Sequence, residues 1–142
     1  MKTILLILVP FMLVLLAAGM FLRPQETLSN LTLESPSGAE LVRAENTLLV
    51  DIRTPEEWRD TGVIEGALLV TYSDADSFLS AIAPHREEGQ KIALVCRSGN
   101  RSSRAARQIA AQVDTPVMDV AGGMIRIVAE GYAPVRAQPV TR

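Results

Sequence analysis

The sequence predicts an α/β domain with a mainly parallel central sheet, preceded by one N-terminal apolar helix. Short apolar runs alternate with longer helix-like runs, an order typical of parallel sheets covered by helices. We expect strands, each apolar enough to be buried on both faces, at Leu48–Ile52, Ala67–Val70, Ile92–Val95 and Val117–Val120. We expect helices at Asp74–Arg86 and Ser102–Val113, and short helices after the capping boxes Ser37-Gly38-Ala39-Glu40 and Thr54-Pro55-Glu56-Glu57.

The N-terminal segment, residues 1–23, is predicted to be a signal anchor or a signal peptide. Residues 4–22 contain no charged side chain, and a helix of nineteen residues spans about 28 Å, close to the thickness of a bilayer core. Lys2 precedes this run, which places the amino terminus in the cytoplasm and the domain on the extracytoplasmic, periplasmic side of the membrane. A small-residue sequence, Ala17-Ala18-Gly19, leaves cleavage as an open alternative to anchoring.

The rest of the chain divides into a polar linker at residues 24–36, one domain at residues 37–135 and a loose tail at residues 136–142. The chain has 142 residues, 48% of them hydrophobic, which suits one domain and one apolar segment. Its 14 basic and 16 acidic residues form no basic footprint, so we expect no nucleic-acid partner. One cysteine and one histidine do not make a usual zinc site, so we expect no metal and no cofactor, and His85 is interpreted as a surface residue.

The candidate catalytic residue is Cys96, the only cysteine. It ends an apolar strand and directly precedes a helix, so unpaired backbone N–H groups at the helix start should point toward it. Two arginines, Arg97 and Arg101, add positive charge, and Gly99 allows the loop to wrap around an anion. Such surroundings stabilise a thiolate, the nucleophilic form, without a histidine base.

Other polar residues near this loop receive expected roles. Ser98 and Asn100 are candidate hydrogen-bond donors to a bound anion, and Arg104 and Arg107 are interpreted as surface residues. Structural support is expected from Asp51, Arg53 and Ser102, with Asp51 or another strand-end acid as a candidate ion-pair partner of one of these arginines, and Trp58 is expected to pack.

Four ordered sequence blocks resemble the rhodanese-like domain family. The loop Cys96-Arg97-Ser98-Gly99-Asn100-Arg101-Ser102 is similar to the family's C-R-S-G-x-R-S. The other blocks are Leu49-Val50-Asp51-Ile52-Arg53 with Pro55-Glu56-Glu57-Trp58, then Gly62-Val63-Ile64-Glu65-Gly66-Ala67, and Gly122-Gly123-Met124. Two positions depart from the family pattern: Val63 stands where His is frequent, and Ile127 where Trp is frequent. The resemblance implies a three-layer fold and leaves substrate preference and local packing open at these two positions.

The resemblance also implies a sulfurtransferase reaction. Cys96 would take sulfur from thiosulfate or a persulfide and pass it from a Cys96 persulfide to a thiol, to cyanide or to a protein acceptor, with residues 97–101 binding the donor. One alternative is a binding, relay or sensing module without turnover, in which the region of Val63 and Ile127 shapes a protein surface. A phosphatase or arsenate reductase is a third possibility, disfavoured because those related enzymes have five residues between Cys and Arg, where this loop has four.

Overall fold

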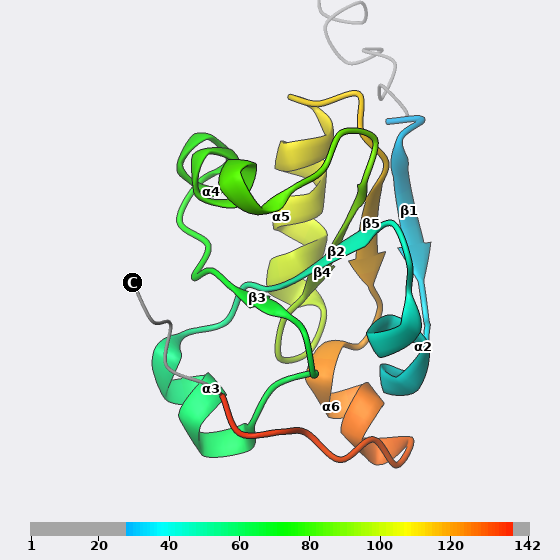
Figure 1. Ribbon diagram of the computed structural model, residues 1–142, viewed down its shortest axis with the longest axis vertical. Helices are drawn as coiled ribbons and strands as arrows, with labels where there is room; N and C mark the ends of the chain where they lie inside the picture. Colours follow the sequence, from blue (N-terminus) through cyan, green and yellow to red (C-terminus); the bar gives the residue numbers. More distant parts are fainter. Residues whose placement is uncertain (1–27, 138–142) are drawn as a thin grey trace, which may run out of the picture.

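A five-stranded parallel sheet forms the centre of the computed structural model, which describes residues 28–137 (Figure 1). The strand order is β1-β5-β4-β2-β3, and every pairing between these strands is parallel. The strands are β1 (Leu31–Glu34), β2 (Thr47–Asp51), β3 (Leu68–Leu69), β4 (Lys91–Val95) and β5 (Val117–Val120). The helices are α2 (Gly38–Arg43), α3 (Pro55–Thr61), α4 (Ala75–Ile82), the 3₁₀ helix η1 (Ala83–His85), α5 (Asn100–Ala110) and α6 (Gly123–Ala129). The expected α/β class is therefore confirmed.

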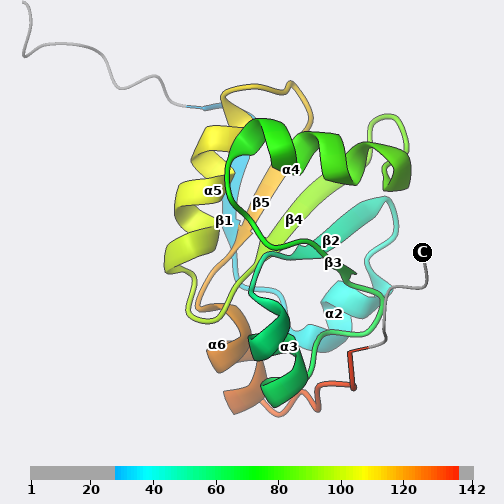
Figure 2. The ribbon, with the colours of Figure 1, turned by 90° about the vertical axis from the view of Figure 1, so that its left-hand side faces the viewer.

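Helices cover both faces of the sheet, so the domain has three layers (Figure 2). On one face α4 and α5 bury side chains that include Phe78 and Ile109 against the sheet. On the other face α2 and α6 bury Leu41, Met124 and Ile127. Because both faces are covered, the central strand β4 is buried along four of its five residues, as parallel strands require. This position fixes the end of β4, from which the cysteine loop leaves.

Both capping boxes predicted from the sequence are confirmed. The Ser37 side chain accepts from the Glu40 N–H while the Glu40 carboxylate accepts from the Ser37 N–H, and Thr54 and Glu57 repeat this arrangement at α3. These contacts satisfy backbone donors that have no partner within the helix. They set where α2 and α3 begin.

The predicted linker is wrong over Leu31–Glu34, which forms β1 and pairs with β5. Asn30, the residue directly before β1, also holds this segment in place, because its side-chain amide donates to the carbonyl oxygens of Ala110, Val113 and Thr115. As a short edge strand with Leu33 exposed, it lacks the apolar run by which the inner strands were predicted.

Other boundaries also differ from the prediction. The helix expected at Asp74–Arg86 ends at Ile82 and continues as η1, because Pro84 cannot supply the N–H that a further α-helical turn needs. The helix expected from Ser102 to Val113 spans Asn100–Ala110, since Gly99 turns the chain into it with φ of 91°. The strand expected at Ala67–Val70 is reduced to Leu68–Leu69, and α6 was not predicted.

The predicted apolar helix at residues 4–22 lies outside the described residues, as does most of the predicted tail at residues 136–142. Within residues 28–137 no helix has the length and apolar character needed to cross a membrane.

The start of α6 lies against the backbone of the cysteine loop. The N–H groups of Met124 and Ile125 donate to the carbonyl oxygens of Cys96 and Arg97 at 2.8 and 3.0 Å. This approach requires Gly123, whose φ is +55° and whose missing side chain would overlap the Cys96 carbonyl oxygen and lie 2.8 Å from the Arg97 carbonyl carbon. The double glycine therefore allows α6 to hold the loop.

Replacing Gly123 by Ala is expected to destabilise the domain by about 2–4 kcal/mol, because left-handed strain adds to a clash with backbone that cannot move away. Chemical denaturation followed by circular dichroism measures this change. The matched control is Gly131→Ala, where φ is also positive, at +99°, but nothing lies within 4 Å of the new Cβ. Equal losses in both variants would mean that strain alone, and not the contact with the loop, requires Gly123.

Candidate active site

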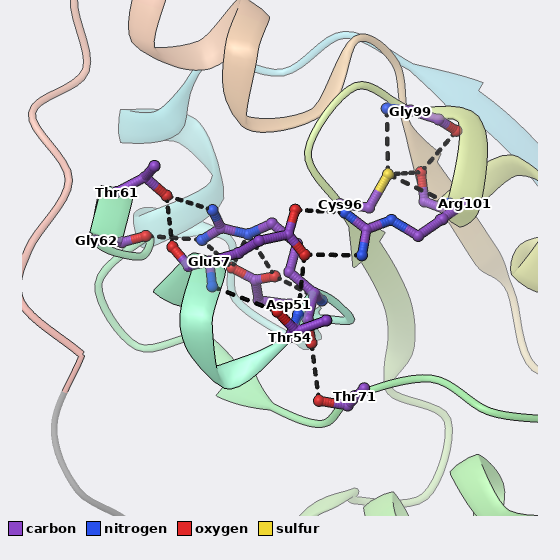
Figure 3. A network of polar contacts seen from close by, with 11 residues as sticks. Asp51, Thr54, Glu57, Thr61, Gly62, Thr71, Cys96, Gly99 and Arg101 are labelled. Carbon is purple, nitrogen blue, oxygen red and sulfur yellow. Dashed lines mark hydrogen bonds and ion pairs between the residues drawn. The ribbon is translucent and has the colours of Figure 1, made fainter. Parts of the chain in front are cut away.

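The Cys96 thiol lies at the amino end of α5, where backbone donors converge on it (Figure 3). Its Sγ accepts hydrogen bonds from the N–H groups of Gly99 at 3.2 Å and Ser102 at 3.4 Å. The residue itself is fully buried. The predicted convergence of helix-start N–H groups on Cys96 is therefore present, and these donors with the helix dipole favour negative charge on sulfur.

Two further loop amides are free to bind an anion. The carbonyl groups of Cys96 and Arg97 point at α6, and the peptide bonds are trans. In a trans peptide the N–H points opposite to the carbonyl, so the N–H groups of Arg97 and Ser98 point away from α6. Neither has a hydrogen-bond acceptor within residues 28–137. The loop thus offers unused donors next to those that already contact the sulfur.

The Arg101 side chain is held by Glu57 of α3. Its Nη1 and Nη2 donate to Oε2 and Oε1 of Glu57 at 2.8 and 2.5 Å (Figure 3). The hydrogen bonds from Arg101 lower the pKa of Glu57 to about 2, and the same bonds raise the pKa of Arg101. This pair positions α3 against the loop and uses one N–H of each terminal nitrogen, so the donor-binding role expected of Arg101 stays a prediction.

Asp51 and Arg53 form a buried ion pair beneath α3. The guanidinium Nε and Nη2 of Arg53 donate to the Asp51 carboxylate at 2.7–3.0 Å, and its remaining contacts are to Thr61 Oγ1 and the Gly62 carbonyl oxygen. The Arg53 side chain is only 1% exposed. The expected pairing of Asp51 with a loop arginine is therefore wrong, because Asp51 is occupied by Arg53 and Glu57 takes Arg101.

The remaining predicted loop residues lie at the surface. Arg97, Ser98 and Asn100 are exposed, and the side chain of Arg97 has no hydrogen bond or ion pair within residues 28–137. Arg104, Arg107 and His85 are exposed as expected. Among the described residues no three His, Cys, Asp or Glu side chains gather in a way that would hold a metal ion.

The two positions that depart from the family pattern are both interior. Val63 is 5% exposed and Ile127 is 1% exposed. Both side chains pack within the domain, while the neighbouring Ile125 and Val128 are exposed, so the expectation that this region shapes a protein surface stays a prediction.

A groove of about 660 Å³ begins at Arg97 and runs between α3 and α6. One wall is apolar and comes from α6 and the chain after it, with Met124, Ile125, Val128, Ala129 and Pro134. The other wall is polar and comes from α3, the buried arginine and the loop, with Glu57, Asp60, Thr61, Arg53 and Arg97. Ile125 and Val128 are about half exposed in it. A groove of this size accommodates a small organic molecule next to the loop.

Sequence reasoning missed two acidic residues at the site. Glu57 was recognised as a helix cap, and its second carboxylate contact, to Arg101, depends on long-range folding. Asp119 was read only as part of a strand, although it is the single charged residue in β5, and the structure places its carboxylate 2.6 Å from the Ser102 hydroxyl. The sequence did offer a signal for Asp119, because a single acidic residue in a strand predicted to be buried needs a polar partner.

The Glu57–Arg101 pair is expected to make stability depend on pH. The carboxyl has a pKa of 4.5 without these contacts and about 2 with them, so the pair stabilises the fold fully above pH 4.5 and loses this effect as the pH falls through 2. The difference corresponds to roughly 3 kcal/mol, which solvent screening of the partly exposed Arg101 reduces to about 1–2 kcal/mol. Glu57→Gln, which keeps a capping oxygen, should be destabilised by that amount at pH 7 and hardly at all at pH 2.

Urea denaturation at several pH values, followed by the fluorescence of the single tryptophan, Trp58, measures this difference. Glu56→Gln is the matched control, since Glu56 lies in the same helical turn and pairs only with the exposed Arg59. A stability loss in Glu57→Gln that stays constant down to pH 2 would show that the charge of Glu57 is not the cause.

Asp51→Asn is expected to destabilise the domain by about 3–5 kcal/mol, because it leaves the buried Arg53 guanidinium without its counter-charge. Thermal and chemical unfolding measure the loss, with the exposed Asp60→Asn as control. Alkylation of Cys96 under folding conditions should keep its rate, since Asp51 makes no contact with the thiol. A large change in that rate at unchanged stability would assign Asp51 to the reactive centre.

Comparison with known proteins agrees with this geometry. The family model described as a rhodanese-like domain matches residues 37–132. Thiosulfate sulfurtransferase 16, chloroplastic, of Arabidopsis thaliana is 32% identical over 101 residues, which cover 62% of this chain and 83% of that protein. The crystal structure of a rhodanese-related protein from Thermoplasma volcanium superposes with a TM-score of 0.56 at 28% identity, covering 73% of this chain and 99% of the other.

A second solved structure, from Rhodopseudomonas palustris, has a TM-score of 0.59 and 25% identity, and covers 72% of this chain and 84% of the other. It carries the name of a protein of unknown function and possible tyrosine phosphatase. The family model spans more than half of the chain, and the matched region contains the whole cysteine loop, its partner helix α3 and the double glycine of α6. The chain therefore belongs to the rhodanese-like domain family.

Proposed function

We propose that this protein is a sulfurtransferase that carries sulfane sulfur as a persulfide on Cys96. The observation that supports it most directly is the pair of backbone N–H groups, from Gly99 and Ser102, that donate to Sγ at the start of α5. Donors in this position stabilise the thiolate that attacks the sulfur donor and, after transfer, negative charge near the same atom.

The proposed reaction consists of two displacements. The Cys96 thiolate attacks the outer sulfur of thiosulfate, a new S–S bond forms, and the S–S bond of thiosulfate breaks with its electron pair leaving on sulfite. A thiolate acceptor then attacks the outer sulfur of the Cys96 persulfide and takes that sulfur, and Cys96 regains its thiolate. An organic persulfide can replace thiosulfate, and cyanide can replace the thiol, without changing this balance.

The loop and the groove supply separate contacts for donor and acceptor. The unused N–H groups of Arg97 and Ser98 and the free guanidinium of Arg97 favour the oxyanion of the donor. The groove between α3 and α6 has an apolar wall with Ile125 and Val128, which favours an acceptor thiol with an organic body. Arg101 and Glu57 hold the two sides of this arrangement together.

A phosphate-ester hydrolase is the competing reading, favoured by the name of the Rhodopseudomonas palustris structure. Such a reaction needs a guanidinium fork free to bind phosphate in the loop. Here one edge of the Arg101 guanidinium is paired with Glu57, and four residues separate Cys96 from Arg101, a shorter loop than those enzymes have. The shorter loop favours transfer of a single sulfur atom over phosphate chemistry.

Intact mass spectrometry of the full chain, purified in mild detergent, tests the proposal. Incubation with thiosulfate or an organic persulfide should add about 32 daltons to the wild type, and cyanide should remove that mass, because covalent sulfur transfer requires this intermediate. Cys96→Ser is the matched control and should gain no mass. Steady release of sulfite with a thiol acceptor would then demonstrate turnover.

Two other outcomes would contradict the assignment as a sulfurtransferase. Rapid alkylation of Cys96 with no sulfur adduct from any donor would favour a binding or relay module that acts only with a partner protein. Hydrolysis of a phosphate ester that is lost in Cys96→Ser would favour the phosphatase reading.

A further inference from the structure

The Ser102 hydroxyl lies between the Cys96 thiol and the carboxylate of Asp119, in the interior behind the loop. Cys96 and Ser102 are fully buried, and Asp119 is 5% exposed. The Cys96 Sγ lies 3.6 Å from Ser102 Oγ, and Ser102 Oγ lies 2.6 Å from Asp119 Oδ1. Asp119 thus reaches the reactive sulfur through one hydroxyl group, and the proposed sulfur transfer makes no use of it.

The direction of the hydrogen bonds follows from the single hydrogen of the Ser102 hydroxyl. Its possible acceptors are Asp119 Oδ1 at 2.6 Å and the Gly99 carbonyl oxygen at 3.1 Å. The short contact to a carboxylate is the stronger of the two, because a charged acceptor strengthens a hydrogen bond. The hydrogen therefore points toward Asp119, and the lone pairs of Oγ face Cys96. In this orientation Ser102 accepts a hydrogen bond from the Cys96 thiol but cannot donate one to the thiolate.

The charged groups around the sulfur also disfavour the thiolate form of Cys96. Within residues 28–137 Arg101 is paired with Glu57 and Arg53 with Asp51, while Asp119 has no ion-pair partner. The free guanidinium nearby is that of Arg97, which is exposed to water. A buried carboxylate without a counter-ion disfavours a second negative charge on a group joined to it by one hydroxyl.

We propose that Asp119 is a positioning residue that acts through Ser102 to hold the unloaded Cys96 in its thiol form. The proposal rests on Cys96 being the nucleophile of the proposed function, and it concerns the regulation of that same site. The backbone N–H groups of Gly99 and Ser102 favour the thiolate, while the Ser102 hydroxyl and Asp119 oppose it. Asp119 therefore restrains the reaction of the free thiol with oxidants and alkylating agents.

The rate of Cys96 alkylation by iodoacetamide, measured on the full chain between pH 5 and pH 10, tests this role without a sulfur donor. In Asp119→Asn the pH of half-maximal rate should fall by about one unit, so that alkylation on the acidic side becomes about tenfold faster. Asp114→Asn, an exposed residue before the other end of β5, is the matched control and should leave the profile unchanged. An unchanged or raised midpoint in Asp119→Asn would overturn the proposal.

Ser102→Ala provides a second test that remains valid if Asp119→Asn does not fold. Removing the hydroxyl removes the acceptor of the thiol proton, so the midpoint should fall; a rise would mean that Ser102 donates to the thiolate and would overturn the proposal. In the Ser102→Ala background, adding Asp119→Asn should change the rate clearly less than the tenfold expected in the wild type, since only the direct effect of the Asp119 charge remains. A full tenfold effect there would exclude the path through Ser102.

These measurements separate the two proposals. A wild-type protein that takes up no sulfur, yet shows the expected alkylation profiles, would remove the sulfurtransferase assignment and support the role of Asp119. A protein that forms the persulfide but whose Asp119→Asn profile is unchanged would keep the transfer reaction and remove the role of Asp119.

Discussion

The site depends first on the backbone contact between α6 and the cysteine loop. Because the carbonyl oxygens of Cys96 and Arg97 accept hydrogen bonds from α6, the N–H groups of the same peptides turn to the opposite side. The turn at Gly99 then brings two more N–H groups onto the sulfur. The anion-binding face of the loop is therefore a consequence of where its carbonyls are held, and the double glycine that permits the close approach is as much a part of the site as the cysteine.

Two ion pairs hold charged residues beside the loop within residues 28–137. Arg53 with Asp51 supports the base of α3, and Arg101 with Glu57 joins α3 to α5. Glu57 serves both as a cap of α3 and as the partner of Arg101, so the start of that helix and the loop are set by the same carboxylate. Within residues 28–137 neither Arg97 at the surface nor Asp119 in the interior belongs to an ion pair, and in the two proposals Arg97 acts on the donor and Asp119 on the thiol.

The sequence alone predicted those features that depend on neighbours in the chain. The reactive loop, both capping boxes and the strands β2 to β5 are encoded locally, by a cysteine before a helix, by Ser or Thr three residues before Glu, and by short apolar runs. Strand β1 was missed because its pairing with β5 is set by distant residues and one of its leucines is exposed. The partner of Arg101 was missed for the same reason. The sequence of the loop shows that Arg101 is positively charged, but it does not show which of several distant carboxylates lies next to it.

The balance at Cys96 follows from the difference between backbone and side-chain donors. The orientation of a backbone N–H group is fixed by the chain, so the N–H groups of Gly99 and Ser102 keep pointing at the sulfur and stabilise negative charge on it. The Ser102 hydroxyl can rotate, and Asp119 draws its hydrogen away from sulfur. In the proposed reaction, an anionic donor bound by the loop amides and Arg97 would present its outer sulfur to the Cys96 thiolate, and after transfer the negative charge would reside on the outer sulfur of the persulfide. Asp119 then acts chiefly against the free thiolate, the one state of the cycle that reacts with any electrophile it meets.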